Sequence, residues 1–473
     1  MQQTNNKISH SKLVPKFGMK DKIGYMFGDF GNDFFFTLVS SFLMVFYTDV
    51  FGISPAIVGV LFLVARIWDA FMDVTVGRFI DSRSTTKNGK FKPWIIRFSP
   101  FLVSFGLLTF VKIPGMSDQF YLVYALATYM IWGSLYSAVN IPYGSMASVI
   151  SGVSSERASL STFRTIGATI AGTAVGVIVP MYGFINNKID SDRFVIIGVV
   201  FAILSMVCYS LCYLLPTERI TAIETPKDAP KEKKLSLGAT LKTLTKNKPF
   251  VIFVTASLVL IITKQFIGSI NTYLFKDYFN NAKALGLLNS FSILTIFIIP
   301  PIVAPITRKY GKKEAASVGM LFSSVVYLLL AFLPIQNVNL FAVLMFIGNL
   351  GYFLFLYTLW AFVTDLIDYQ EYLTGERADG TIYSLYSFSR KAGQAIAGLF
   401  GGVALSVVGY VAKAPHQTAA VALSIKRFAL LTPAIGYFVI FLILKFLYPM
   451  TKERLAKMSI DLEAKRTQRQ NLG

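Results

Sequence analysis

The chain of 473 residues has the composition of a membrane protein. Hydrophobic residues make up 54% of it and charged residues only 15%, and its mean hydropathy is +0.58. Soluble domains carry about 25% charged residues, because a surface that faces water is polar. The formal net charge of +20 does not indicate a nucleic-acid partner, because the basic residues lie mostly in short connections between apolar segments. The composition excludes a soluble globular protein and indicates a lipid bilayer as the partner of most of the surface.

Apolar blocks long enough to cross a membrane recur along the whole chain. A helix of about twenty residues spans the ~30 Å hydrocarbon core of a bilayer. Clear blocks of this kind lie at residues 34–50, 56–80, 194–215, 250–274 and 428–448. They leave no room for a large soluble domain between them.

The two cysteines do not indicate a metal site, and the N-terminal residues do not indicate a signal peptide. Cys208 and Cys212 lie four residues apart in an apolar block. We expect them to pack inside a span, because a metal site would need further ligands. The first 24 residues are polar and rich in lysine, without the short apolar core of a signal peptide, so a cleaved signal peptide is not expected.

The distribution of Lys and Arg predicts the orientation of the spans, because these residues stay on the cytoplasmic side. The N-terminal arm has five of them, residues 78–97 have six, residues 219–248 have eight and the tail after residue 448 has six. The connections near residue 51 and at residues 114–118 have none. This alternation predicts an even number of spans, with both termini and the central linker in the cytoplasm.

The predicted fold is an all-α membrane protein with twelve transmembrane helices in two six-helix halves. The predicted parts are a cytoplasmic arm (1–24), an N-terminal half (25–215), a cytoplasmic linker (216–248), a C-terminal half (249–448) and a cytoplasmic tail (449–473). A faint internal repeat supports this division, since a basic loop with glycine follows the second span of each half. Paired six-helix halves recur in transporters, with the substrate site at their interface.

The most specific local signal is a group of charges in the second span. Arg66, Asp69 and Asp73 are spaced by three and four residues, which places them on one helix face. An ionised side chain at the bilayer centre costs about 2.5–3.5 kcal/mol, so such residues usually have a function. Two carboxylates one turn apart either hold a small cation or share a proton. A structural ion-pair network between helices is the alternative.

Other polar positions in or near the spans are weaker candidates. Asp33 is either a site residue or a carboxylate favoured by the dipole of a helix N-terminus. Lys391 is either a counter-ion to the aspartates of the other half or a lysine that extends from a helix end to the interface. Asn140 can donate to and accept from sugar hydroxyls. Tyr136 offers an aromatic face to a pyranose ring, although aromatic residues are also common interface anchors.

Seven ordered segments carry a resemblance to a known family. They are residues 28–33 (GDFGND), 47–50 (YTDV), 65–73 (ARIWDAFMD), 89–94 (GKFKPW), 140–142 (NIP), 365–369 (DLIDY) and 390–391 (RK). With them, nearly the whole chain resembles the glycoside–pentoside–hexuronide:cation symporter family of the major facilitator superfamily, which includes the melibiose permease. The resemblance implies the major facilitator fold and no enzymatic activity.

The resemblance also implies roles for single residues. Asp69 and Asp73 match the family's cation-site carboxylates, and they would bind a metal only with sodium coupling. Ser137 stands at the place of a threonine in a sodium-coupled member. Arg164 matches a basic residue of the sugar pocket.

Two of the other candidates also match the family's sugar site. Asp33 falls at an acidic sugar ligand, and Lys391 at a lysine that links the cation and sugar sites. Asn140 and Tyr136 complete the expected sugar-binding group.

The sequence departs from the family pattern at three positions. Asn140 replaces an acidic sugar ligand, and Gly144 replaces a tryptophan of the pocket. Met72 stands where sodium-using members can carry an asparagine, which favours H⁺ over Na⁺ as the coupling ion. The segments that look most like the xyloside and glucuronide branches are residues 140–144, 371–375 and 383–398.

The expected function is secondary active symport of a small glycoside with a cation across the cell membrane, without a cofactor. Asp33 would repel a carboxylate, which favours a neutral pentoside or xyloside. A hexuronide is the alternative, with Arg164 or Lys391 as its anion partner. An uncoupled facilitator or a sugar sensor also remains open. A membrane-embedded glycosyl-processing enzyme would need sizeable loops with acidic or nucleophilic residues, whereas the longest loop here is basic.

Five acidic residues cluster within fifteen positions of the C-terminal half. The sequence predicts a cytoplasmic loop there, with two alternatives: contacts to basic loops of the other half that open and close a gate, or a solvated turn. The members of this acidic group are Asp365, Asp368, Glu371, Glu376 and Asp379.

Overall fold

The computed structural model describes residues 15–219 apart from 84 and 87, and residues 247–374, 379–414 and 416–472. Nearly all of them are helical. Most of the predicted arm and linker, and Glu376 of the acidic group, lie outside the described residues.

The first half consists of six long helices. They are α1 (Met19–Phe46) with its π-helical continuation η1 (Tyr47–Phe51), α2 (Pro55–Asp81), α3 (Lys92–Leu108), α4 (Asp118–Ile150), α5 (Ser154–Tyr182) and α6 (Ser191–Leu214). A short antiparallel hairpin, β1 (Phe184–Ile185) with β2 (Lys188–Ile189), connects α5 to α6.

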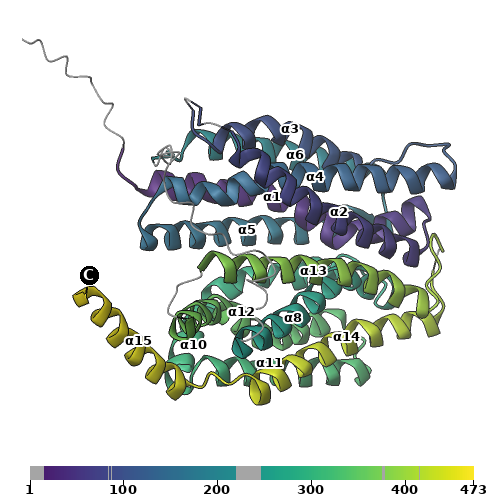
Figure 1. Cartoon of the computed structure of the whole chain (residues 1–473). Helices are drawn as coiled ribbons and strands as arrows, with labels where there is room; N and C mark the ends of the chain where they lie inside the picture. Colours follow the sequence, from purple (N-terminus) through teal and green to yellow (C-terminus); the bar gives the residue numbers. More distant parts are fainter. Residues whose placement is uncertain are drawn as a thin grey trace, which may run out of the picture.

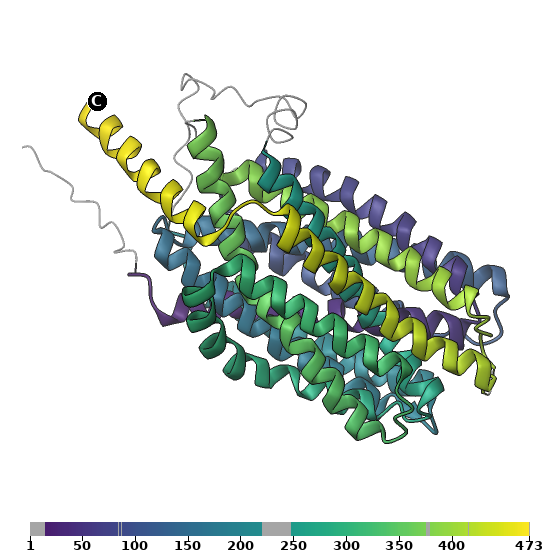
Figure 2. The same ribbon diagram turned by 90° about the horizontal axis from the view of Figure 1, so that it is seen from below.

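The second half repeats this arrangement with more interruptions. It contains α8 (Lys248–Tyr273) with η2 (Leu274–Tyr278), α9 (Ala284–Ser290), α10 (Ser292–Tyr310), α11 (Lys312–Phe332), α12 (Val338–Thr374), α13 (Asp379–Val407), and α14 (Ala419–Leu442) with η3 (Ile443–Leu447). A last helix, α15 (Lys452–Leu472), follows the bundle and projects from it (Figure 2).

Local sequence explains where several helices begin. The side chains of Ser117, Asp190, Asn247 and Thr418 each accept a hydrogen bond from the backbone N–H three residues later. Such caps satisfy N–H groups that have no partner inside the helix. At the other end of the first span, Gly52 ends η1 with a φ of 82°, a conformation that favours glycine.

The fold is the predicted twelve-helix major facilitator arrangement. Within the described residues, nine helical segments are long and apolar enough to cross a membrane by length and composition. The remaining three of the twelve are α2, α3 and α13, which pack in the same bundle. Of these, α2 and α13 carry the charged residues singled out in the sequence.

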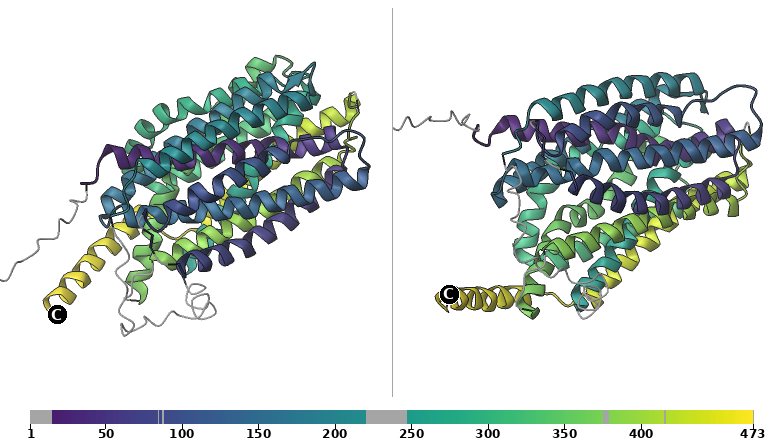
Figure 3. Two further views of the ribbon diagram at one scale, coloured as in Figure 1. Left: turned by 90° about the horizontal axis from the view of Figure 1, so that it is seen from above. Right: turned by 45° about the horizontal axis from the view of Figure 1, so that its top comes forward.

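The two halves lie side by side along their length (Figure 1). The contacts between them are made mainly by α2 with α13, α5 with α9, and α1 with α8. The start of α1 and the whole of α15 lie at one end of the bundle in all views (Figure 3). We call this the terminal end, and the opposite end, where α1, α8 and α13 finish, the distal end.

The prediction that the acidic group lies in a loop is wrong for its first three residues, which are helical. Asp365, Asp368 and Glu371 all lie within α12, which continues to Thr374. Asp365 accepts a hydrogen bond from Lys312 Nζ at 2.6 Å, so its partner belongs to the same half. Asp379 is the first residue of α13.

Candidate functional site between the two halves

The charged face of α2 points into the protein. Asp69 is only 8% exposed, whereas Ile67, Phe71 and Val74 on other faces of the helix are more than half exposed. The side chain of Asp73 is also mostly covered. The aspartates therefore lie on the protein side of α2 and the large apolar residues on the side available to lipid.

Asp69 is held by its own helix and by α4. Arg66 Nη1 lies 3.2 Å from Asp69 Oδ2, the i,i+3 pair that the spacing allows. The other oxygen, Asp69 Oδ1, is buried and has no hydrogen-bond partner. The carboxylate rests on Gly133 of α4, where any β-carbon would overlap it. Ser137, one turn further along α4, is buried.

Asp73 is joined to the other half of the protein. It forms an ion pair with Lys391 of α13. Lys391 also interacts electrostatically with Asp69 and Arg66. It lies twelve residues after the start of α13, so the alternative of a lysine at a helix end is wrong. The helix pair α2–α13 that carries this contact is one of the most extensively packed in the molecule.

The two aspartates are the acidic part of the expected cation site. In the part of the chain that the structure describes, no group of three or more His, Cys, Asp or Glu residues could hold a metal ion. Divalent cations usually take six to eight oxygen ligands, several of them carboxylates. Two carboxylates suit a proton or a monovalent cation instead.

Asp33 lies in the interior of the first span. It stands fourteen residues after Met19, the start of α1, so the alternative of a carboxylate at the helix N-terminus is wrong. The structure places it near Arg164 of α5 and near two cations of the other half, Lys264 of α8 and Arg390 of α13. It is thus surrounded by charges from both halves.

Asp29 belongs to this group but was not singled out in the sequence analysis. Arg164 Nε donates to Asp29 Oδ2 at 2.7 Å, and its guanidinium lies 5.1 Å from the ring centre of Tyr143. Asp29 is 9% exposed and interacts electrostatically with Asp33. The signal was available in the sequence, because Asp29 stands four residues before Asp33 and therefore on the same face of α1.

A chain of hydrogen bonds orients Asn140 of α4. Tyr209 Oη of α6 donates to Asn32 Oδ1 at 2.7 Å, and Asn32 Nδ2 donates to Asn140 Oδ1 at 3.5 Å. Tyr136, one turn earlier on α4, packs against Phe36 with ring centres 5.6 Å apart. Asn140 and Tyr136 are both half-buried. Both side chains thus contact α1, the helix that carries Asp33.

Lys264 and Arg390 are the other two residues missed as site candidates. Both are exposed although they lie within or beside spans of the bundle. The hydroxyl of Thr272 in α8 donates to the backbone carbonyl of Ser41 in α1, which fixes the register of the two helices. Lys264 and Asp33 each lie eight residues before this contact, on α8 and α1 respectively. Since α1 and α8 run in the same direction here, the two charges lie at about the same depth, some 12 Å from that contact.

Comparison with known proteins agrees with this architecture. The profile of the family described as "MFS/sugar transport protein" matches residues 24–452. "Uncharacterized symporter YjmB" of Bacillus subtilis is 36% identical and covers 97% of this chain and 98% of its own. The "Isoprimeverose transporter" of Lactiplantibacillus pentosus is 33% identical, covering 98% of this chain and 94% of its own. The "Glucuronide carrier protein homolog" of Escherichia coli is 31% identical, covering 95% and 96%.

Solved structures are similar in fold. A bacterial homologue of the human lysosomal transporter Spinster aligns with a TM-score of 0.63 over 93% of this chain and 99% of its own, at 12% identity. A D-xylose–proton symporter aligns with a TM-score of 0.60 over 92% and 97%, also at 12% identity. At such low identity the likeness shows the fold alone. The family match and the relatives above 30% identity go further: the chain belongs to the MFS/sugar transport protein family, among the glycoside–pentoside–hexuronide:cation symporters, and is a membrane transporter rather than an enzyme.

Proposed function

We propose that the protein imports a neutral glycoside of the pentoside or xyloside type together with a proton, by alternating access of a site between its two halves. The coupling ion would bind at Asp69 and Asp73, with Ser137 beside them. The sugar would bind at Asp33, Asn140, Arg164 and Tyr136. In this proposal the protein lies in the cell membrane with both termini in the cytoplasm.

The observation that carries this proposal is the charge arrangement on α2. Asp69 has one buried oxygen without a partner, and Asp73 is paired with Lys391 from the opposite half. A proton or cation that binds here would compete with Lys391 for Asp73. Because Lys391 belongs to α13, its release would loosen the contact between the halves and leave its ammonium group available to the sugar. Ion binding and sugar binding would thus favour each other, and such coupling is reciprocal.

The ligand set supports the proton over sodium. A sodium ion would need several oxygen ligands around it, whereas the described residues offer two carboxylates that already face Arg66 and Lys391. A proton needs only one acceptor, and Asp69 Oδ1 is such an acceptor. Met72 adds no oxygen ligand on the same helix.

The N-terminal half supports a neutral sugar. Asp33 and Asn140 can accept and donate hydrogen bonds to hydroxyl groups. Arg164 is already engaged by Asp29, so it is not a free partner for a carboxylate. The relative named as an isoprimeverose transporter agrees with a pentose-containing substrate.

A hexuronide is the second candidate, and one observation favours it. Lys264 and Arg390 are exposed, and no ion pair is found for either among the described residues. The two positive charges of Lys264 and Arg390 exceed the single negative charge of Asp33 by one. This excess positive charge would suit the carboxylate of a hexuronide. If so, the anion partners are these two residues and not Arg164 or Lys391, which both have acidic partners. The relative named as a glucuronide carrier homologue agrees with this alternative.

Transport by purified protein in liposomes tests these proposals. Uptake of radiolabelled methyl β-xyloside and methyl β-glucuronide would be measured under an inward proton gradient and, separately, under an inward sodium gradient. We expect uphill accumulation of the xyloside with the proton gradient only. If the glucuronide accumulates instead, and if the Lys264→Gln variant no longer accumulates it, the hexuronide would replace the neutral glycoside as the proposed substrate.

The Asp73→Cys variant tests the ion site in the same liposomes. We expect its sugar to reach only equal concentrations on both sides, an accumulation ratio of about one, because coupling is lost. Asp118→Asn is the matched control, since Asp118 is an exposed acid at the distal start of α4 and should leave accumulation unchanged. Uphill uptake by Asp73→Cys would refute the site. Uptake by the unaltered protein that only equalises the sugar concentrations under both ion gradients would indicate an uncoupled facilitator.

A further inference from the structure

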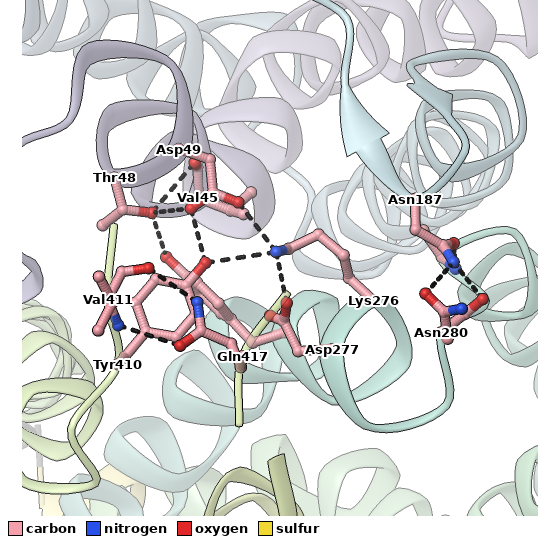
Figure 4. Close-up of polar contacts among 12 residues, drawn as sticks. Val45, Thr48, Asp49, Asn187, Lys276, Asp277, Asn280, Tyr410, Val411 and Gln417 are labelled. Atoms are coloured by element: carbon pink, nitrogen blue, oxygen red, sulfur yellow. Dashed lines mark hydrogen bonds and ion pairs between the residues drawn. The ribbon is translucent and has the colours of Figure 1, made fainter. Parts of the chain in front are cut away.

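A second group of buried charges lies at the distal end, away from the proposed sugar and ion sites. Lys276 of η2 is the centre of this group (Figure 4). Its Nζ lies 2.9 Å from Asp49 Oδ2 of η1 and 2.7 Å from Asp277 Oδ1. The side chains of Lys276 and Asp277 are each 8% exposed, and that of Asp49 is 15% exposed. The pair Asp49–Lys276 joins the two halves, because η1 continues α1 and η2 continues α8.

Tyr410, in the connection between α13 and α14, closes the group from a third element. Its Oη donates to Asp49 Oδ1 at 2.6 Å and accepts from Lys276 Nζ at 3.3 Å. Its ring meets that of Tyr273 edge to face, with centres 5.0 Å apart. Tyr273 Oη in turn lies 3.0 Å from Thr48 Oγ1. The ends of three helices are thereby tied together.

The neighbouring connections are also joined across the halves. Asn187, in the β1–β2 hairpin, donates from Nδ2 to Asn280 Oδ1 at 2.7 Å, and its Oδ1 accepts from the backbone N–H of Ala282 at 2.9 Å. Gln417 forms two hydrogen bonds with the backbone of Val411 and so braces the segment that carries Tyr410 (Figure 4).

Most polar contacts that join described residues of the two halves lie toward this end. Besides those above, Ser406 Oγ accepts from the backbone N–H of Ala56, and Asn289 donates to the carbonyl of Gly176 at 2.9 Å. These residues lie in the parts of α2, α13, α9 and α5 that are near the distal end. The Asp73–Lys391 pair is the exception, deeper in the bundle.

We propose that Asp49, Lys276, Asp277 and Tyr410 form a latch that holds the distal end of the transporter closed, and that must open for the central site to reach that side. We call these four residues the distal latch. When the halves part, Lys276 and Asp49 lose their mutual attraction and the hydrogen bonds of the group, and hydration repays part of this loss, so the group favours closure by a modest amount. While the end is closed, removing either partner would leave the other charge buried without compensation. Tyr410 adds a charge-assisted hydrogen bond to Asp49 and ties α13 to α1.

The charge balance of the latch gives each residue a distinct effect. Two carboxylates share one ammonium group, so the group carries one surplus negative charge if both acids are ionised. Asp277 Oδ2 is buried without a hydrogen-bond partner. Asp277 thus competes with Asp49 for Lys276 from the same half, which weakens the contact across the halves. Removing the charge of Asp277 should therefore tighten the latch, whereas removing the charge of Asp49 or Lys276 should open it.

Distances between spin labels measure the closure directly and require no substrate. Labels at Met116 and Val411 report on the distal end, since both residues are exposed there and belong to different halves. In Lys276→Gln and Asp49→Asn we expect the population with a long label distance to rise about tenfold. In Asp277→Asn we expect it to fall below that of the unaltered latch.

Matched variants separate the latch from a general loss of structure. Lys283→Gln removes an exposed lysine at the same end and should leave the distance distribution unchanged. Tyr410→Phe removes a single hydroxyl and should open the end less than Lys276→Gln. The charge exchange Asp49→Lys with Lys276→Asp should restore much of the closed population, because the inter-half pair is rebuilt.

A second label pair, at Arg83 and Lys309, reports on the terminal end as an internal reference. The buried native cysteines are replaced in all variants. Unchanged distal distances in both Lys276→Gln and Asp49→Asn would overturn the proposal. The proposal would also be overturned if Asp277→Asn opened the distal end as much as Lys276→Gln and Asp49→Asn do. That result would show that the group is needed only for folding. Since no transport is measured, failure of the proposed sugar or ion does not affect the result.

Discussion

At the scale of single residues, several buried aspartates in the described part of the chain occur in ion pairs. Asp69 faces Arg66, Asp73 faces Lys391, Asp29 faces Arg164 and Asp49 faces Lys276. This follows from the high cost of an isolated charge in a low-dielectric interior. Among the described residues, three buried aspartate oxygens have no hydrogen-bond partner: Asp69 Oδ1, Asp277 Oδ2, and Asp365 Oδ2, which lies beside Lys312 Nζ. The first lies in the proposed ion site and the second in the distal latch.

Gly133 is expected to position Asp69 by leaving room for its carboxylate. In Gly133→Ala the added methyl group would overlap Asp69, and the carboxylate would have to move away from its place beside Arg66. We expect proton-driven accumulation to fall at least about tenfold, because a displacement of about 1 Å can cost a hundredfold in activity. Radiolabelled sugar uptake in liposomes measures this.

Gly77 provides the control for this prediction. It lies in the helix α2 itself, and a β-carbon there meets no atom within 4 Å. Gly77→Ala should transport like the unaltered protein. Normal coupling in Gly133→Ala would show that Asp69 tolerates displacement and would remove Gly133 from the site.

At the scale of helices, glycines decide how closely the halves approach. Where α2 crosses α13, a β-carbon on Gly402 would overlap the carbonyl oxygen of Pro55 and lie 2.8 Å from the Cα of Gly59. Small residues allow such close backbone packing in membranes, where van der Waals contact is the main source of helix association. The same helix pair carries the Asp73–Lys391 contact. Its spacing therefore matters for the proposed ion site as well as for stability.

Gly402→Ala should lower the stability of the protein in detergent. The overlap is with backbone atoms, which cannot rotate away, and overpacking of this kind costs about 1–3 kcal/mol. A thermal unfolding scan measures the expected fall in Tm. Gly172→Ala is the control, because the nearest atom to its β-carbon is Thr37 Oγ1 at 3.5 Å, an ordinary contact. Equal Tm values for the two variants would contradict the packing argument.

At the scale of the whole molecule, both ends of the described chain lie at one end of the bundle (Figure 1). This follows from the even number of spans. It also gathers the basic residues of the terminal connections at that end and leaves the distal end with few of them. By the positive-inside rule the terminal end would face the cytoplasm. The distal latch would then close the outer side of the membrane.

Labelling of single cysteines tests this orientation. Lys457→Cys in α15 and Met116→Cys at the distal end are both at exposed positions. In intact cells, a membrane-impermeant maleimide should label the cysteine at 116 and not the one at 457. In inverted vesicles the pattern should be reversed. Labelling of residue 457 from outside would place the termini on the wrong side and would reassign the latch to the cytoplasmic face.

Much of the site could be predicted because it depends on local spacing. The i,i+3 relation of Arg66 and Asp69 is a property of any helix, and the same spacing rule could have indicated Asp29 beside Asp33. Spacing and residue type also indicated Asp73, Lys391 and Asn140, and the family motifs added Ser137 and Arg164. The acidic group around Asp365 was harder, since polar residues at the end of a long helix resemble a loop in composition. Its partner Lys312 belongs to the same half, as the structure shows.

The sequence by itself determined the membrane setting, the twelve spans, the two halves and the faces on which the charges lie, because hydrophobic length and helical period are local properties. Only the tertiary structure decided which charge meets which, as for Arg164 with Asp29 and Lys276 with Asp49. These pairs join residues more than a hundred positions apart. Their register depends on how far the helices slide and rotate as they pack, and that is set by close contacts such as Gly402 against Gly59.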